Sequence, residues 1–154
     1  MQTNGGLATA SSSYSGGGFG PAGTINGDRK GISWGNNGGW NDDTISSYPD
    51  WLQIDFNGIK SIREIDVFTV QDNYASPADP TPSMTFSLYG ITAFQVQYWN
   101  GSSWQDVSAG AVNGNNHVWS QFIFSPVSTS RIRVLVNNSL GSFSRITEVE
   151  AYGN

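Results

Sequence analysis

The clearest indication of the fold comes from residues 48–69, YPDWLQIDFNGIKSIREIDVFT. In its first half Leu52, Ile54 and Phe56 alternate with polar residues, which is the period-two pattern of a strand that buries one face. The same pattern returns over 65–69, and an Asn-Gly pair between the two halves predicts a turn. The stretch therefore predicts two consecutive half-buried strands.

Alternating runs farther along the chain predict more strands, over 94–99, 103–107, 118–124, 132–136 and 146–152. Asn100-Gly101 falls between the first two of these runs, a pattern typical of a hairpin with a two-residue turn. No segment shows a helical period. About eight short strands around one core indicate a single all-β domain over 1–154, an antiparallel sandwich or barrel.

Composition narrows the classes of function. Charged residues are only 12% of the 154 residues and glycines number 19, which argues against a coiled coil, a helical bundle or a charged disordered chain. A net charge of −5 gives no basic field for nucleic acid or for an anionic membrane. Because the chain has no cysteine, it has no disulfide, no thiolate metal site and no cysteine nucleophile.

Catalytic motifs find little support in the sequence. His117 is the only histidine, and no G-x-S-x-G elbow accompanies it, which disfavours a Ser-His-Asp triad. The aspartates occupy polar strand positions or loops, and nothing selects the carboxylate pair that glycoside hydrolysis needs. We therefore expect no enzymatic activity, and a glycoside hydrolase is the least favoured alternative.

Two loop segments favour sugar binding. Residues 40–43, WNDD, and 71–74, QDNY, each place an aromatic residue next to amides and carboxylates. Sugar rings stack their apolar C–H faces on Trp or Tyr, and their hydroxyls pair with such polar groups. The alternative is that Trp40 and Tyr74 only anchor their loops to the core.

Residues 24–34, TINGDRKGISW, are dense in oxygen atoms. Asn26, Asp28 and Ser33 lie close together there, and two glycines free backbone carbonyls to turn toward one point. Calcium prefers six to eight such oxygens, although the spacing does not match an EF-hand. A polar loop without metal is the alternative.

The last predicted strand contains an unusual carboxylate. In regular alternation Glu148 shares a face with Ile146 and Tyr152. If that face points inward, the carboxylate is buried and needs a hydrogen-bond set or a metal. The alternative is a β-bulge that rotates the strand and leaves Glu148 in water.

Several segments occur in an order that resembles a known family. They are LATASSSYS, GTINGDRKGISWG, the 48–69 stretch, FQVQYWNGSSWQDV, SRIRVLVNNS and RITEVEAYG. Together they resemble a discoidin, or coagulation-factor type C, domain of the galactose-binding-like superfamily, over essentially the whole chain. Many bacterial carbohydrate-binding modules appended to glycosidases belong to that family. The resemblance implies an eight-stranded antiparallel jelly-roll β-sandwich.

The resemblance also implies a structural calcium ion, held by a loop and by a glutamate of the last strand. The matching positions here are Asn26, Asp28, Ser33 and Glu148, although Asn26-Gly27 stands where the family commonly has Asp-Gly.

The histidine and arginine that galactose-binding relatives use are absent from the matching places, near Asp50 and near Val70-Gln71. Sugar binding would therefore use another set of residues: Trp40, Asp50, Gln71, Asn73 and Tyr74.

From these observations we expect a non-catalytic carbohydrate-binding or adhesion module with a structural calcium. Its partner would be a glycan or glycoconjugate, and neither nucleic acid nor a membrane. We expect it to be part of a larger secreted or cell-surface protein, whose targeting signal is outside this sequence. The main alternative is a protein-interaction or structural module of the same fold without a sugar site.

Overall fold

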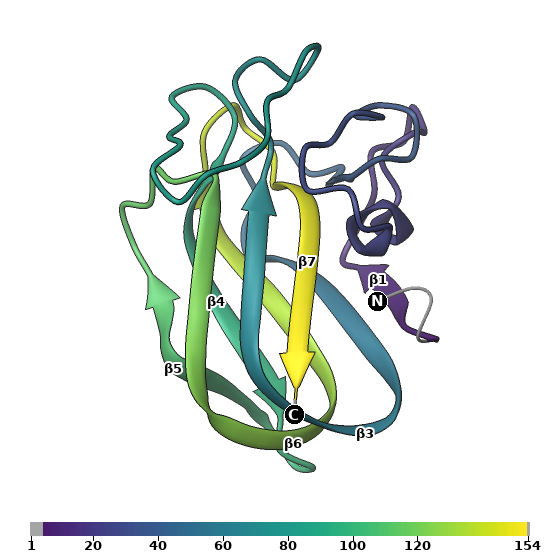
Figure 1. Ribbon diagram of the computed structural model, residues 1–154. Helices are drawn as coiled ribbons and strands as arrows, with labels where there is room; N and C mark the ends of the chain where they lie inside the picture. The colour runs from purple at the N-terminus through teal and green to yellow at the C-terminus, as the bar shows by residue number, and fades with distance from the viewer. Residues whose placement is uncertain (1–4, 154) are drawn as a thin grey trace.

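The computed structural model describes residues 5–153, and its regular structure is almost entirely strand (Figure 1). The elements in chain order are β1 (Leu7–Ala10), the 3₁₀ helix η2 (Pro21–Ile25), β2 (Trp40–Asn41), β3 (Asp50–Thr69), β4 (Ile91–Trp99), β5 (Trp104–Val112), β6 (Trp119–Ser139) and β7 (Arg145–Gly153). None of the helical structure in these residues is long and apolar enough to cross a membrane.

Two long strands, β3 and β6, run through both layers of the fold. The first half of β3 pairs with the second half of β6, and β1, β4 and β5 complete this layer. The second half of β3 pairs with β7 and with the first half of β6, and β2 extends this layer beyond β7. All these pairings are antiparallel. The expected all-β antiparallel jelly-roll sandwich is confirmed.

The number of strands differs from the expected eight, because predicted neighbours are continuous. The two runs of the 48–69 stretch form one strand, β3, whose register with β6 shifts between Asp55 and Lys60. Gly58 has a φ of +85° within that shift, so the Asn-Gly pair bends the strand as a bulge and does not reverse it. The runs over 118–124 and 132–136 likewise join in β6, whereas β1 and β2 are too short to show a pattern.

The predicted hairpin of β4 and β5 is confirmed, but its predicted two-residue turn is wrong. The loop spans four residues, 100–103, between the two strands. Asn100 Oδ1 accepts hydrogen bonds from the backbone N–H groups of Ser102 and Ser103, at 2.8 and 2.9 Å. Gly101 takes a φ of +101°. The asparagine side chain thus closes a wider loop than the sequence pattern suggests.

The core lies between the two layers and comes from the alternating positions of the long strands. Leu52 and Ile54 of β3 face it from one layer, and Ile65 and Val67 of the same strand face it from the other. The remaining strands add further apolar side chains, including Phe94, Val96, Ile132, Val134, Val136, Ile146 and Val149. Burial of this apolar surface is the main source of stability of the sandwich.

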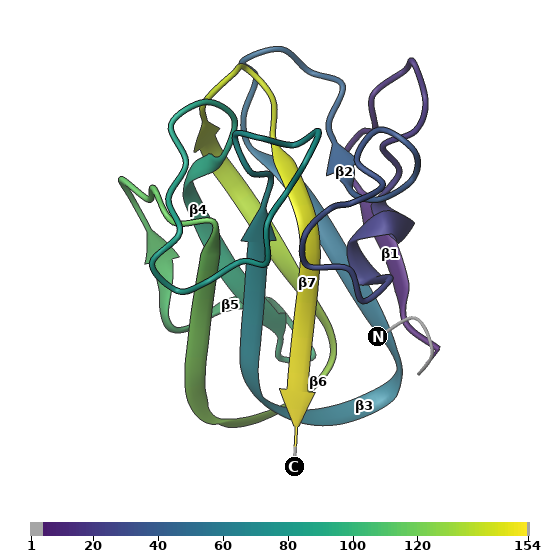
Figure 2. The same cartoon turned by 45° about the horizontal axis from the view of Figure 1, so that its top comes forward.

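The long loops gather at one end of the sandwich, opposite the end of β7 (Figure 1). Figure 2 shows the β3–β4 connection, residues 70–90, on one side of β7 and the segment that precedes β2 on the other. This end therefore brings together parts of the chain that are far apart in sequence.

The segment before β2 is packed tightly, and this tight packing yields a prediction. A Cβ atom on Gly23 would lie 2.5 Å from both the carbonyl oxygen of Asn37 and the backbone nitrogen of Gly39. We expect Gly23→Ala to lower the free energy of unfolding by about 1–3 kcal/mol, measured by urea denaturation, because backbone atoms must move. Gly20→Ala is the matched control, since a Cβ there meets nothing within 4 Å. Equal stability of the two variants would contradict the packing of this segment.

Candidate functional site: an aromatic pocket at the loop end

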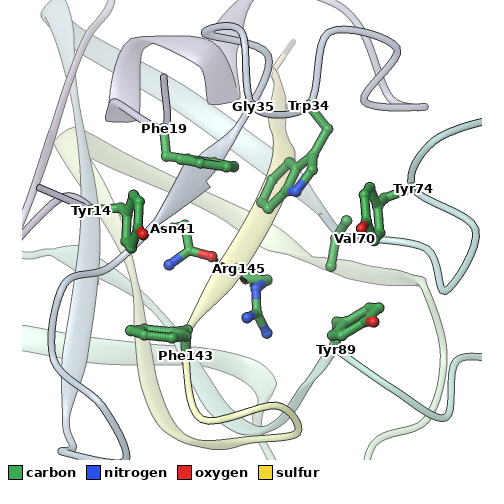
Figure 3. Close-up of a pocket in the computed structure, with 10 residues that line it drawn as sticks. All are labelled: Tyr14, Phe19, Trp34, Gly35, Asn41, Val70, Tyr74, Tyr89, Phe143 and Arg145. Atoms are coloured by element: carbon green, nitrogen blue, oxygen red, sulfur yellow. Dashed lines mark hydrogen bonds between the residues drawn. The ribbon is translucent and has the colours of Figure 1, made fainter. Parts of the chain in front are cut away.

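A pocket opens between the two groups of loops (Figure 3). Its volume is about 420 Å³, within the range of small-ligand sites. The lining residues come from stretches far apart in sequence: Tyr14, Phe19, Trp34, Gly35, Asn41, Val70, Tyr74, Tyr89, Phe143 and Arg145.

Aromatic side chains form the walls of this pocket. Phe19 packs edge-to-face against Tyr14 and Trp34, with ring centroids 5.6 and 5.1 Å apart. On the other side Tyr74 and Tyr89 pack in the same way at 5.7 Å (Figure 3). Each ring is held by a neighbour, so the walls are preformed. Tyr74 is nevertheless 47% exposed and leaves much of its surface open to a ligand.

Arg145 lies at the centre of the pocket (Figure 3). Its guanidinium carbon is 5.2 Å from the ring centroid of Tyr89 and 5.3 Å from that of Phe143. Nε donates a hydrogen bond to Asn41 Oδ1 at 2.8 Å. Burial lowers the pKa of Arg145 from its ordinary value, yet an arginine remains charged at neutral pH. The pocket therefore combines apolar walls with a fixed cation.

Although it has only two residues, β2 positions this arginine. Trp40 pairs with Ile146 and Asn41 with Arg145 across the β2–β7 ladder. The indole of Trp40 is completely buried, and its Nε1 donates a hydrogen bond to the carbonyl of Ser12 at 2.8 Å. The buried indole thus fixes both the strand pair and the segment that leads to Tyr14.

A buried carboxylate extends this arrangement beyond β2. Asp42 Oδ1 accepts a hydrogen bond from the backbone N–H of Ser144 at 2.7 Å. Its Oδ2 accepts bonds from the N–H and the hydroxyl of Thr44, at 2.8 and 2.7 Å. Asp42 therefore ties the start of β7 to the residues that follow β2.

Of the five sugar-binding residues predicted from the sequence, Tyr74 lines the pocket. The prediction is wrong for Trp40, because an indole with no exposed surface cannot stack on a sugar ring. Asp50 is also buried; it accepts a hydrogen bond from the hydroxyl of Ser144 at 2.7 Å, and its Oδ1 lies 3.1 Å from the hydroxyl oxygen of Thr44. Burial raises the pKa of the Asp50 carboxyl. This residue holds loops together and has no surface for a ligand.

The two remaining predicted residues do not line the pocket either. Gln71 is buried, and its side-chain amide exchanges two hydrogen bonds with the backbone of Ala78, at 2.7 and 3.0 Å. It braces the start of the β3–β4 connection. Asn73 is exposed on that connection and lies outside the lining.

Most of the pocket was not predicted from the sequence, namely Tyr14, Phe19, Trp34, Tyr89, Phe143 and Arg145, whereas Asn41 belongs to the 40–43 segment that the sequence pattern indicated. The available signal was the occurrence of single aromatic residues among glycines and serines, as in GGGFG, GSFS and SLYG. Such residues lie in loops, which lack the regular alternation that predicts in a strand which side chains face the core.

The predicted metal residues lie on and beneath the 26–33 loop. Asn26 Oδ1 accepts a hydrogen bond from the backbone N–H of Asp28 at 2.9 Å. The Asp28 carboxylate accepts bonds from the N–H groups of Lys30 and Ile32, at 3.0 and 2.7 Å. Ser33 is exposed at the end of the loop. These side chains shape the loop from within.

Glu148 lies beneath this loop. The two alternatives for it, a buried carboxylate or a strand rotated by a β-bulge, are each partly correct. The β3–β7 register shifts next to its partner Phe68, so a bulge does rotate the strand. The carboxylate is nevertheless only 1% exposed, because the loop covers it. Oε1 accepts a hydrogen bond from the N–H of Gly27 at 2.9 Å, whereas Oε2 is buried with no partner among the described residues. Burial raises the pKa of Glu148 to about 8.

Comparisons with known proteins agree on the type of domain. The family model described as F5/8 type C domain matches residues 8–149. No curated protein matches the chain.

Solved structures with the same fold include three modules bound to or named for sugars. The family 32 carbohydrate-binding module of Clostridium perfringens NanJ, in complex with galactose, is 19% identical, with a TM-score of 0.67 and coverage of 95% of this chain and 92% of that one. A second C. perfringens module, in complex with GalNAc-β-1,3-galactose, is 15% identical, with a TM-score of 0.70 and coverage of 99% and 97%. Chitosan-binding module 2 of a Paenibacillus chitosanase/glucanase, in complex with chitotriose, is 16% identical, with a TM-score of 0.71 and coverage of 96% and 95%.

The raised pKa of Glu148 predicts how the stability of the protein depends on pH when EDTA keeps it free of metal ions. The folded protein keeps this proton up to about pH 8, whereas an ordinary glutamate loses it near 4.5. The folded state thus binds more protons in between, so the free energy of unfolding should fall by a few kcal/mol as pH rises from about 5 to 8. Glu148→Gln should flatten this dependence in urea titrations. Asp79→Asn, which removes an exposed carboxylate, is the control, and an unchanged slope in Glu148→Gln would refute the assignment.

Proposed function

The chain belongs to the F5/8 type C domain family, and on that premise we propose that it is a non-catalytic carbohydrate-binding module that holds its glycan in the aromatic pocket. One observation carries the proposal. Six aromatic side chains surround a single cavity whose centre carries an arginine and an asparagine. Stacking rings around a few fixed polar groups suit a ligand with apolar C–H faces and hydrogen-bonding edges, which is the chemistry of a sugar.

The solved relatives support sugar binding as a class and leave the particular sugar open. Their ligands are galactose, GalNAc-β-1,3-galactose and chitotriose, on a fold that this chain shares at 15–19% identity. The fold presents its loops at one end, and the loops decide the ligand. The glycan of this chain follows from its own pocket.

The pocket favours binding over catalysis. Its lining in the described part of the chain includes no carboxylate and no histidine, the usual acids and bases of glycoside hydrolysis.

The chain also matches 25% of a Ruminococcus gnavus fucosidase at 16% identity, with a TM-score of 0.68. We propose that the module belongs to a larger protein that acts outside the cell or on its surface. By binding a glycan, the module would hold this larger protein close to it.

The covered Glu148 supports a structural calcium ion as part of this proposal. Its Oε2 is a buried polar oxygen without a partner among the described residues, and it lies beneath a loop rich in oxygen atoms. No group of three or more His, Cys, Asp or Glu side chains in residues 5–153 could hold a metal, so the site would have to add amide, hydroxyl and backbone oxygens to two carboxylates. That donor set suits calcium. Asn26, Asp28, Ser33 and Glu148 are the residues that would hold the ion.

Sugar binding in the pocket can be tested with single aromatic variants. We expect Tyr74→Ala and Trp34→Ala to weaken glycan binding about tenfold or more in calorimetric titrations against a glycan panel, because each removes a stacking surface. Tyr152→Ala is the matched control, since Tyr152 is 41% exposed but lies outside the pocket. If a glycan binds all three variants equally, the site is elsewhere. If the panel yields no ligand, the protein-interaction alternative is favoured.

Calcium binding predicts a shift in melting temperature. Excess calcium should raise the melting temperature of the EDTA-treated protein, because a ligand that binds only the folded state stabilises it by mass action. Glu148→Gln should abolish this shift, while Asp79→Asn should preserve it. A wild-type melt that ignores both EDTA and calcium would rule the ion out.

A further inference from the structure

The pocket holds a cation, Arg145, that no carboxylate of residues 5–153 contacts directly. Arg145 takes part in no ion pair among the described residues. Its hydrogen bonds go to neutral oxygens, namely Asn41 Oδ1 at 2.8 Å and the carbonyls of Leu140 and Gly141 at 3.4 and 3.2 Å. A guanidinium has five N–H donors, and these bonds use one on each nitrogen. One donor on each of the two terminal nitrogens therefore remains for a ligand.

Asp42 is the carboxylate whose charge acts on Arg145, but it cannot serve as that partner. It is completely buried, and both of its oxygens already accept hydrogen bonds from Ser144 and Thr44. Breaking those bonds would free the start of β7 from the residues after β2. Among residues 5–153 no carboxylate is therefore available to pair with Arg145, and a bound ligand could supply one.

The aromatic walls of the pocket strengthen the ion pair that such an anion would form with Arg145. The guanidinium lies between the rings of Tyr89 and Phe143, and aromatic side chains make up most of the remaining lining. An ion pair formed in surroundings of low polarity is stronger than one formed in water. A charge-assisted, two-pronged contact between a guanidinium and a carboxylate is also among the strongest polar contacts available.

We infer, on the basis of the proposed sugar-binding function, that the pocket selects sugars that carry a carboxylate, the uronic acids, over neutral sugars. The carboxylate of a uronic acid extends from the edge of the ring, and the C–H faces lie on either side of it. A ring that enters edge-first places its carboxylate against the two free donors of Arg145. Its faces then lie along the walls formed by Tyr74 on one side and by Phe19 and Trp34 on the other (Figure 3).

The charge of the whole chain works in the opposite direction. A net charge of −5 repels an anionic glycan at long range. At about 0.15 M salt the screening length is about 8 Å, so this repulsion is weak once the ligand reaches the pocket. The selection for a carboxylate arises at contact and should be measured at that ionic strength.

The test compares ligands that differ only at the carboxyl group, on the unaltered protein. Calorimetry would use trimers of galacturonic and of glucuronic acid and the carboxyl-reduced counterpart of each. We expect at least one acidic trimer to bind roughly tenfold to a hundredfold more tightly than its reduced form. Equal affinity of both forms overturns the inference, and so does binding of neutral glycans alone. If those neutral glycans are lost in Tyr74→Ala, the proposed function still stands.

A pair of arginine variants shows whether Arg145 is the source of the preference. In Arg145→Gln the ratio of affinities for the acidic and reduced trimers should fall to about one. Arg133→Gln is the matched control, because Arg133 stacks on Trp104 outside the pocket, and it should keep the ratio. The comparison of ligands on the wild-type protein remains decisive if Arg145→Gln does not fold. A ratio unchanged in a folded Arg145→Gln would remove Arg145 from the inference.

Discussion

The short pairing of β2 with β7 is the contact on which the pocket depends. It places three consecutive residues that act in different directions: Trp40 fills the interior, Asn41 orients Arg145, and Asp42 binds the backbone of Ser144. Burial of an indole contributes a few kcal/mol, which offsets part of the entropy cost of ordering the glycine-rich segment before it. Asn41 also exchanges backbone hydrogen bonds with Tyr14 and Phe19, so the same pairing fixes the wall that these two residues form.

The framework was predictable from sequence, because regular alternation reports which side chains face the core. It identified the runs that became β3, β4, β6 and β7, and the hairpin of β4 and β5. Where strands continue through a bend, as at Gly58, an Asn-Gly pair was read as a reversal, because local sequence does not distinguish a bulge from a turn. The two shortest strands depend on tertiary pairing and leave no pattern.

The site was harder to predict, because it is made of loop residues that meet only in the folded protein. Tyr74 was predicted from its polar neighbours and lines the pocket, whereas Trp40, in a similar context, is a buried anchor. The two differ in burial, and in loops burial is set by contacts distant in sequence. Glu148 was the more informative residue, since a carboxylate in a buried strand required an explanation from sequence alone and is indeed covered by a loop.

Glycan binding in the aromatic pocket is tested most directly by an NMR titration that follows the indole and amide signals as a glycan that binds the protein is added. We expect the indole N–H of Trp34 and the backbone amides of Tyr74 and Arg145 to shift together. The indole signal of Trp104, which lies outside the pocket, should stay in place. Shifts that instead cluster around Trp104 would show that the glycan binds elsewhere and would contradict binding in the aromatic pocket.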